Sequence, residues 1–387
     1  MRYIVFILTL FCLSACSSTA PIPLVTEDFR DENDEKRLWQ RSEDEQKVLN
    51  ESGLIYEDQE LNQYLNCIAK RLQPPEILER IIFKVIVIKS PYLNAFAFPN
   101  GVLYVHTGIL AQMDNEAQLA ALLGHEMTHC THRHALRTLR HLKSKTGFLS
   151  GTQRVLIRFG GIGDLVNLLG SLGSRAAVSG YSRDFETEAD MVGLRLMAKA
   201  GYDPNEALKL FEHIKRELEQ EKVKEPFFFG THPKLQDRVE NCKDFIGTHY
   251  QSEGPGIKNG DVFLTKLHKV ILHNAGLDLK AGRFDAAQRE AEKYLTIKLN
   301  DARAYYLLGE IYRQRGKADD MKKAKTYYEK AISMDPAYPD PHKAIGLLYY
   351  KDGKKTLAKR SFEMCLSLSP QTADKAYIVG YLRQCNQ

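Results

Sequence analysis

The sequence predicts a mostly helical α+β protein in two parts, and three observations support this fold class. Apolar residues with helical spacing dominate the 387-residue chain, whereas strand-like runs are confined to residues 81–106. A helical pattern with a period near 34 residues recurs in the C-terminal third. Hydrophobic residues make up 43% of the chain and charged residues 27%, which argues against wholesale disorder and against a polytopic membrane protein.

The charge is unevenly distributed. The whole chain has 54 Lys and Arg against 49 Asp and Glu, but from Asp261 onward 23 basic residues face 15 acidic ones. An acidic partner or a solvated helical surface would both account for this excess. The basic residues are dispersed, so we expect a solvated surface and no nucleic-acid partner.

Residues 1–15 have the form of a signal peptide. The apolar run after Met1-Arg2 has about ten residues, too few to cross a hydrocarbon core of roughly 30 Å as a helix. Ser14 and Ala15 before Cys16 resemble the lipobox of bacterial lipoproteins, in which the cysteine is acylated. We therefore expect lipidation at Cys16 and a periplasmic protein anchored to a membrane, with an ordinary secretory signal as the alternative.

The residue after Cys16 refines this expectation, because Ser17 in place of Asp is typical of lipoproteins of the outer membrane. Residues 16–46 are polar and acidic, so we expect a tether there. Export would place the remaining cysteines in an oxidising compartment, where their odd number and spacing do not define a pairing. These cysteines are Cys67, Cys130, Cys242, Cys365 and Cys385.

Residues 47–250 alternate predicted helices with one group of short strands. Eight glycines between apolar segments in residues 143–184 predict a mobile flap. Asn100-Gly101 predicts a turn between two strands. We expect strands at residues 81–88, 94–98 and 102–106, and helices over 58–73 and 115–140, from about Glu186, and after an N-cap at Asp203.

The C-terminal part contains a repeat. Ala275, Gly309 and Gly346 occupy equivalent positions, 34 and 37 residues apart, and are followed by aromatic and small residues in the pattern of tetratricopeptide repeats. We expect a linker at residues 251–267 and an all-α solenoid at 268–387, with residues 372–386 as its capping helix. Ordinary helical hairpins without a true repeat are the alternative.

A metal-binding motif lies in the long predicted helix. His125-Glu126-Met127-Thr128-His129 places two imidazoles four residues apart, on one face of a helix, where both can bind one ion. Glu126 lies beside that face and can deprotonate an attacking water. Two surface histidines on a helix would give the same pentapeptide, so the motif requires a further ligand.

A catalytic zinc ion needs three protein ligands and one open position. The metzincin continuation is absent, because His132 and Ala135 stand where it needs glycine and histidine. A second helix supplies carboxylates instead: Glu186 and Asp190 are one turn apart, so one can bind the metal while the other orients a histidine. Spacing alone leaves Glu188 as an alternative ligand.

These residues resemble the metallopeptidase family that includes the CAAX prenyl protease, HtpX and BepA. The resemblance spans roughly residues 45–250 and implies a zincin-type domain with a small sheet. The signal sequence and the repeats point to the BepA-like periplasmic proteases within it. The shared residues are His125-Glu126-x-x-His129, Ser182-Arg183-x-x-Glu186-x-x-Ala189-Asp190, Thr231-His232-Pro233, Arg238, and the strand Asn94-Ala95-Phe96 with its turn at Gly101.

The resemblance assigns roles to the motif residues. It implies one Zn²⁺ per chain bound by His125, His129 and Glu186, with Glu126 as the general base. It places Asp190 behind a ligand histidine, where it orients the ring.

Two further roles follow from the same resemblance. His232 would approach the metal, and Asn94, Ala95 and Phe96 would form the edge strand to which a substrate is added. The alternatives are a capping or packing histidine before Pro233 and a plain structural hairpin. We expect Cys130 and the remaining histidines nearby to be packed or solvated and not to bind metal; these are His106, His132, His134 and His141.

The resemblance implies a zinc endopeptidase of outer-membrane protein quality control. Its substrates would be unfolded, misassembled or stalled envelope proteins, and its repeats would dock clients or the outer-membrane assembly machinery. The alternative is a chaperone or adaptor with a dormant metal site that His232 caps.

Overall fold

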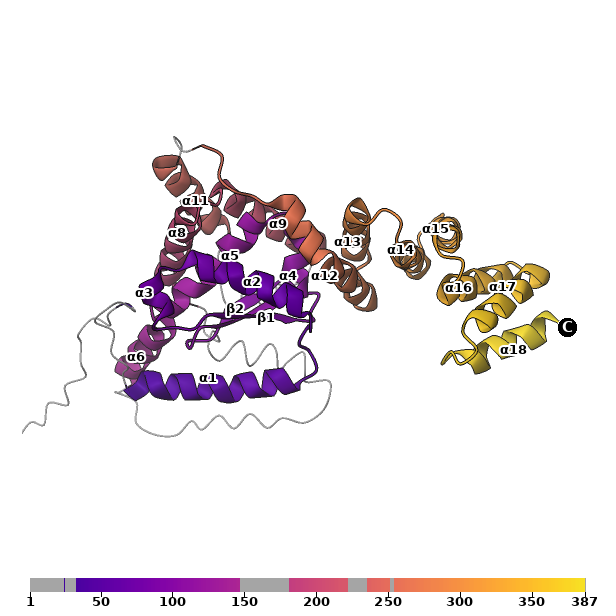
Figure 1. The fold of residues 1–387 in the computed structure, drawn as a ribbon, viewed down its shortest axis with the longest axis horizontal. Helices are drawn as coiled ribbons and strands as arrows, with labels where there is room; N and C mark the ends of the chain where they lie inside the picture. Colours follow the sequence, from indigo (N-terminus) through magenta and orange to yellow (C-terminus); the bar gives the residue numbers. More distant parts are fainter. Residues whose placement is uncertain (1–23, 25–32, 147–180, 222–234, 251–253, 387) are drawn as a thin grey trace, which may run out of the picture.

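The computed structural model describes residues 24, 33–146, 181–221, 235–250 and 254–386, except for the side chains of residues 142–146 and 220–221. It is mostly helical with one small sheet, which confirms the predicted fold class (Figure 1). The elements are α1 (Asn33–Glu51), α2 (Gln59–Leu72), α3 (Pro75–Leu78), β1 (Lys84–Ile88), β2 (Ala95–Ala97), β3 (Val102–His106), α4 (Thr107–Gln112), α5 (Glu116–Thr131), α6 (His134–Thr146), α8 (Arg183–Lys199), α9 (Asn205–Glu221), α11 (Leu235–His249), α12 (Gly260–Lys280), α13 (Phe284–Ile297), α14 (Ala302–Arg315), α15 (Asp320–Met334), α16 (Pro339–Lys351), α17 (Lys355–Leu368) and α18 (Lys375–Cys385).

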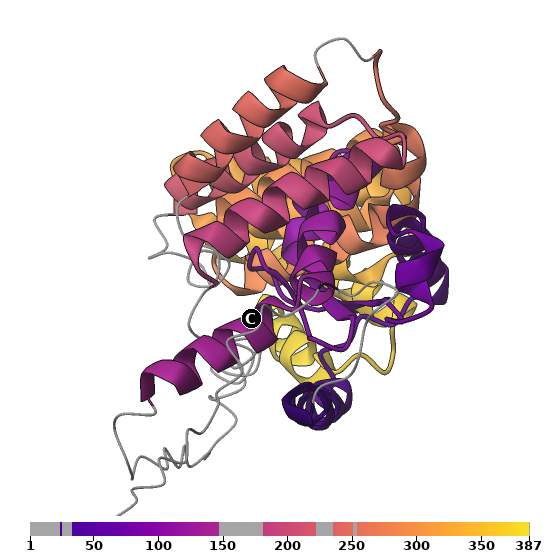
Figure 2. The ribbon, with the colours of Figure 1, turned by 90° about the vertical axis from the view of Figure 1, so that its left-hand side faces the viewer.

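The sheet separates two layers of helices. Its strand order is β1-β3-β2, with β1 parallel and β2 antiparallel to β3. Because side chains alternate along a strand, one face packs on α2 and α5 and the other on Leu49 of α1. Figures 1 and 2 show α1 on one side of the sheet and α8, α9 and α11 on the other.

The α1 helix differs from the sequence expectation, which placed an acidic tether over residues 16–46. From Asn33 onward the chain is helical, and Glu35, Ser42 and Gln46 are buried on the inner face of this helix. Arg140 of α6 donates two hydrogen bonds, of 2.8 and 2.9 Å, to Asp34. Asp34 and Glu35 therefore form ion pairs with other residues of the N-terminal domain, whereas Glu43 and Asp44 on the same helix are exposed.

The long helix expected over residues 115–140 is divided in two. Helix α5 ends at Thr131, and α6 begins at His134 after Arg133 adopts a left-handed conformation with φ of 54°. Arg133 is 3% exposed, and its Nε donates a 2.8 Å hydrogen bond to Glu35 of α1. This buried ion pair holds a backbone conformation that is uncommon for a residue other than glycine.

The repeat region is continuous with the N-terminal domain, whereas the sequence suggested a linker over residues 251–267. Helix α12 begins at Gly260, and its buried side chains Phe263, Leu267 and Ile271 belong to the same hydrophobic cluster as those of α2, α4 and α5. Lys293 of α13 donates hydrogen bonds to two carbonyl oxygens at the end of α4. The first helix pair therefore completes the core of the N-terminal domain.

Helices α13–α18 form an arm that extends away from that domain (Figure 1). Successive helices pack mainly on their neighbours, as in tetratricopeptide arrays. Gly309 faces Tyr328 and Gly346 faces Phe362, so a small residue in one helix receives an aromatic ring from the next. Helix α18 packs on α17, as expected for a capping helix.

Several expectations fall on residues that the structure leaves undescribed. These are the signal peptide with Cys16, His232, and residues 147–180 of the expected flap. In the described part of the chain, no helix is both long and apolar enough to span a bilayer. The cysteines there are free.

Candidate metal centre

Helix α5 brings the two motif histidines together in the interior. Its N-terminus is capped by Asn115, whose side chain accepts a 3.1 Å hydrogen bond from the amide of Gln118. His125 and His129 are 4% and 3% exposed, and their Nε2 atoms lie 3.1 Å apart. Their four-residue separation therefore places both rings on one face, as the sequence predicted.

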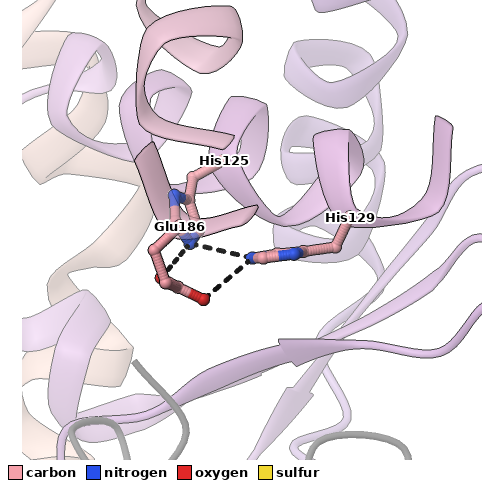
Figure 3. Close-up of side chains that lie close together, drawn as sticks. All are labelled: His125, His129 and Glu186. Carbon is pink, nitrogen blue, oxygen red and sulfur yellow. Dashed lines mark hydrogen bonds and ion pairs between the residues drawn. The ribbon is translucent and has the colours of Figure 1, made fainter. Parts of the chain in front are cut away.

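Glu186 reaches the same point from α8 (Figure 3). The side chain of Ser182 caps α8 by accepting a hydrogen bond from the amide of Phe185. Glu186 Oε2 lies 3.5 Å from His125 Nε2, and Glu186 Oε1 lies 3.7 Å from His129 Nε2. The three ligand atoms lie within 4.8 Å of one another, and all three residues are buried.

The donor set of this cluster fits zinc. Two imidazole nitrogens and one carboxylate oxygen are the ligands of many catalytic zinc sites, and they leave a fourth position for water. Buried, converging polar groups of this kind are costly unless an ion or protons neutralise them. Among the described residues, His125, His129 and Glu186 form the one group of histidine, cysteine and acidic side chains that could hold a metal ion.

Two glycines set the distance between the helices that carry the ligands. Gly193 of α8 lies against Gly124 and His125 of α5, and a Cβ atom on Gly193 would lie 2.8 Å from the backbone nitrogen of His125. A Cβ atom cannot lie this close to a backbone nitrogen, so a side chain at position 193 would force the two helices apart. The absence of side chains here lets Glu186 approach both histidines.

Asp190 holds the His125 ring from behind. Its Oδ1 lies 2.8 Å from His125 Nδ1, and Arg238 of α11 donates hydrogen bonds of 2.7 and 2.8 Å to both carboxylate oxygens. Burial raises the pKa of Asp190, but the charges and hydrogen bonds of Arg238 and His125 outweigh it and hold the pKa well below its usual range. An ionised Asp190 makes His125 Nδ1 the donor, which leaves Nε2 available to the metal.

His134 takes the equivalent place behind His129. The two Nδ1 atoms lie 2.8 Å apart, and His134 Nε2 lies 3.1 Å from Glu188 Oε2. Burial lowers the pKa of His134 to about 4, although the hydrogen bond with Glu188 opposes this shift. The sequence interpretation expected His134 to be merely packed or solvated and missed its contact with His129.

Glu188, which spacing alone left as a possible ligand, lies outside the cluster. Its carboxylate accepts a 2.9 Å hydrogen bond from Arg137 and pairs with His134. Glu186 is therefore the carboxylate that meets the histidines, in agreement with the family resemblance.

Glu126 and Cys130 lie on the same helix as the two histidines. Glu126 is 2% exposed and immediately follows His125, which places it next to the cluster. Cys130 is buried, and its thiol donates a hydrogen bond of 3.3 Å to the carbonyl oxygen of Phe98. Burial raises the pKa of the Cys130 thiol, and the charge of Glu126 adds to this shift. Cys130 thus joins α5 to the strand region, as expected of a packing residue.

The other histidines near the motif stay apart from the cluster. His106 is buried with its Nδ1 3.1 Å from the carbonyl oxygen of Tyr92, and burial lowers its pKa to about 4. His132 contacts Thr131 and lies 3.9 Å from Glu188, whereas His141 is exposed.

Strand β2 forms an edge of the sheet. Two backbone hydrogen bonds join this strand to β3: the amide of His106 donates to the carbonyl oxygen of Asn94 at 3.0 Å, and the amide of Phe98 donates to the carbonyl oxygen of Val102 at 2.8 Å. In an antiparallel ladder the intervening odd-numbered residues direct their amide and carbonyl groups to the other side. No other described strand pairs with that outer side of β2.

Comparison with known proteins agrees with this geometry. Residues 56–246 match the family described as Peptidase family M48, and residues 302–338 and 344–372 match the family described as Tetratricopeptide repeat. The N-terminal domain is therefore a peptidase M48 domain, a class of metallopeptidase. Tetratricopeptide repeats follow it, which confirms the expected resemblance to BepA-like proteases.

Individual relatives match over parts of their length. The mitochondrial metalloendopeptidase OMA1 of Arabidopsis thaliana is 37% identical over 137 residues, which cover 35% of this chain and 27% of that protein. The beta-barrel assembly-enhancing proteases of Escherichia coli (strain K12) and Yersinia pestis are each 26% identical; the matches cover 59% and 73% of this chain, and 47% and 55% of those proteins. The chain thus spans between about a quarter and just over half of these relatives.

Proposed function

We propose that this protein is a zinc-dependent endopeptidase that acts on misfolded or stalled envelope proteins. The observation that carries the proposal is the convergence of His125, His129 and Glu186 in one buried cluster, with Glu126 next to it on α5. Relatives named beta-barrel assembly-enhancing protease support the envelope setting.

The proposed mechanism assigns a task to each buried group. Zinc held by the three ligands would supply Lewis acidity, which makes water nucleophilic near neutral pH and polarises a carbonyl oxygen. Glu126 accepts the proton of the attacking water and transfers it to the leaving amine. Asp190, itself fixed by two hydrogen bonds from Arg238, keeps His125 in the tautomer that presents Nε2 to the metal.

Replacement of Glu126 by glutamine tests this assignment. Glu126→Gln keeps the size of the side chain but cannot accept the proton, so hydrolysis of unfolded casein should fall about 10²- to 10⁴-fold. Bound zinc, measured by metal analysis, should stay at one ion per chain. Glu212→Gln, an exposed change on α9, is the matched control and should cleave normally. Wild-type rates in Glu126→Gln would contradict the mechanism.

The outer edge of β2 is the proposed site for the substrate backbone. Ala95 and Ala97 direct their amide and carbonyl groups away from β3, so an extended peptide can add to the sheet there. The neighbouring Asn94 and Phe96 complete this strand. Binding through backbone hydrogen bonds suits a protease of unfolded clients, because it requires an extended chain and does not depend on the identity of the side chains.

Proline at position 97 tests this edge. Ala97→Pro removes one outward-facing amide donor and leaves the hydrogen bonds between β2 and β3 in place, as edge strands allow. We expect kcat/KM for unfolded casein to fall about fivefold, since one net hydrogen bond contributes about 1 kcal/mol, with zinc content unchanged. Phe96→Pro, which removes an inward donor, should instead destabilise the fold. Normal cleavage by folded Ala97→Pro would exclude this edge as the binding site.

The cellular setting rests on residues outside the described part of the chain. We propose that Cys16 is acylated after removal of residues 1–15 and anchors the protein to the periplasmic face of the outer membrane. The repeats would then dock clients or the outer-membrane assembly machinery. Metabolic labelling with a palmitate analogue, compared between wild type and Cys16→Ala, tests the anchor.

A dormant, His-capped site is the alternative function. His232 would occupy the fourth metal position and leave a chaperone or adaptor. If His232→Ala activates hydrolysis while the wild-type protein only prevents aggregation, the resting protein is capped. Trapping of clients on Glu126→Gln in cells then identifies what the protein handles in either state.

A further inference from the structure

The two histidines of the metal cluster are held from behind by different partners. His125 Nδ1 faces the Asp190 carboxylate at 2.8 Å, whereas His129 Nδ1 faces His134 Nδ1 at the same distance. A histidine that binds metal through Nε2 needs an acceptor opposite Nδ1, because its neutral ring carries the proton there. His134 is the residue in that position behind His129.

The hydrogen-bond chain assigns a proton to each ring. Two Nδ1 atoms 2.8 Å apart share one proton, so if His129 donates, His134 accepts. The proton of His134 must then sit on Nε2, which lies 3.1 Å from Glu188 Oε2. An ionised carboxylate only accepts, so Glu188 orients both donors in the direction that leaves His129 Nε2 for the metal.

The surroundings hold the His134 ring in one orientation. Its side chain is fully buried and stacks on Phe185, with ring centroids 4.5 Å apart and planes 3° from parallel. Tyr181 stacks on His129 with centroids 4.0 Å apart and meets His134 edge-on. Arg137 donates a 2.9 Å hydrogen bond to Glu188 and so fixes the end of the chain.

We propose that His134 is a positioning residue for the ligand His129 and that Glu188 fixes the tautomer of His134. The pair does for His129 what Asp190 and Arg238 do for His125. This proposal rests on the proposed zinc site. It extends the description of that site by adding His134 of α6 and Glu188 of α8 as supporting residues.

Matched substitutions separate positioning from packing. His134→Asn places an amide oxygen where Nδ1 was, so it can still accept from His129, whereas the leucine of His134→Leu has the same branching at Cγ as asparagine and no acceptor. We expect His134→Leu to weaken zinc binding about 10- to 100-fold in competition with a chelator and to shift the visible absorption bands of the cobalt-substituted protein. His134→Asn should recover most of the affinity and the wild-type spectrum.

Two controls complete the experiment. His249→Leu removes an exposed histidine at the end of α11, away from His134 and Glu188, and should leave zinc affinity unchanged. Long-range proton–nitrogen NMR of the zinc-loaded wild-type protein should show His129 protonated on Nδ1 and His134 on Nε2, and this measurement needs no variant to fold.

The outcomes distinguish this proposal from the proposed function. Equal zinc affinity in wild type and His134→Leu would overturn the positioning role, as would equal losses in His134→Leu and His134→Asn, which indicate packing alone. The opposite tautomer in the NMR spectrum would also overturn it. Failure of the wild-type protein to bind zinc would overturn both proposals, whereas zinc binding without hydrolysis would overturn only the proposed function.

Discussion

Two arginine–aspartate pairs with almost the same geometry lie in the two parts of this molecule. Arg238 donates to both oxygens of Asp190 at 2.7 and 2.8 Å, and Arg303 donates to both oxygens of Asp301 at 2.6 and 3.0 Å. The Arg238 side chain is 5% exposed, whereas that of Arg303 is 67% exposed. The difference shows that two features decide how much a bidentate pair contributes to stability: its burial, and whether the aspartate also holds another side chain, as Asp190 holds His125.

Two glycines, Gly193 in the M48 domain and Gly309 in the repeats, also differ in what surrounds them. A Cβ atom on Gly193 would meet the backbone of α5 at 2.8 Å, whereas one on Gly309 would meet the ring of Tyr328 at 2.4 Å. An added methyl group at position 309 would displace one buried side chain, whereas one at position 193 would displace the backbone that carries His125. The M48 domain therefore depends on fixed backbone spacing, and the repeats depend on adjustable side-chain packing.

The largest expected difference comes from removal of each arginine. Arg238→Met leaves Asp190 buried without its main counter-charge, so we expect a loss of about 3–5 kcal/mol in the free energy of unfolding. Zinc affinity should also fall, because His125 loses its fixed support. Arg303→Met should cost less than about 1 kcal/mol, since solvent screens the exposed pair. Urea unfolding of both variants measures this contrast, and equal losses would refute it.

Alanine in place of each glycine should give a smaller difference. Gly193→Ala forces α5 and α8 apart, and we expect a loss of about 3 kcal/mol in stability together with weaker zinc binding. Gly309→Ala should cost about 1 kcal/mol and leave zinc binding unchanged, because only Tyr328 must adjust. Both changes gain the same helix propensity, so urea unfolding and zinc titration isolate the contact itself. Normal zinc affinity in Gly193→Ala would show that the spacing is dispensable.

Mild acid should destabilise the M48 domain more than the repeats, and this is the smallest of the three expected differences. The folded pKa of His106 is about 4 against 6.5 unfolded, so the unfolded state binds its proton first and stability is lost as the pH falls from 6.5 towards 4. The expected loss is about 2 kcal/mol at pH 5. In the repeats, the hydrogen bond from Arg303 lowers the pKa of Asp301 to about 2, so its contribution is lost only below pH 3.8.

Hydrogen exchange at pH 7 and pH 5 measures this difference in acid stability between the two regions. Amides of β3 should lose protection at pH 5, while those of α14 should not. His106→Asn keeps the donor to the Tyr92 carbonyl and should abolish the loss. Equal acid sensitivity of wild type and His106→Asn would assign the effect to other groups.

The core of the candidate site could be predicted from local sequence. The spacing of His125 and His129 places both on one face of any helix, and Glu186 follows at the start of a second helix with Ser182 as its cap. Such features need only neighbouring residues, and the Asn100-Gly101 turn and the repeat period are of the same kind.

The features that the sequence did not predict depend on contacts between residues that are distant in sequence. The end of α5 is set by Arg133, whose left-handed conformation is held by Glu35, 98 residues away. His134 reaches His129 because the helix breaks there, so no local pattern could assign it. The acidic composition of residues 33–46 resembled a tether, since the basic partners of Asp34 and Glu35, Arg140 and Arg133, lie about 100 residues further along the chain.

Helix α12 has a consequence for how a bound chain would be handled. Because Phe263 and Leu267 pack among the side chains of the peptidase domain, the first helix of the repeat arm is part of that domain's hydrophobic core. Under the proposed function, a client bound by the repeats would be held at a distance from His125, His129 and Glu186 that the packing of α12 limits. Cleavage would then require an unfolded segment long enough to span that distance, so compact clients would be spared.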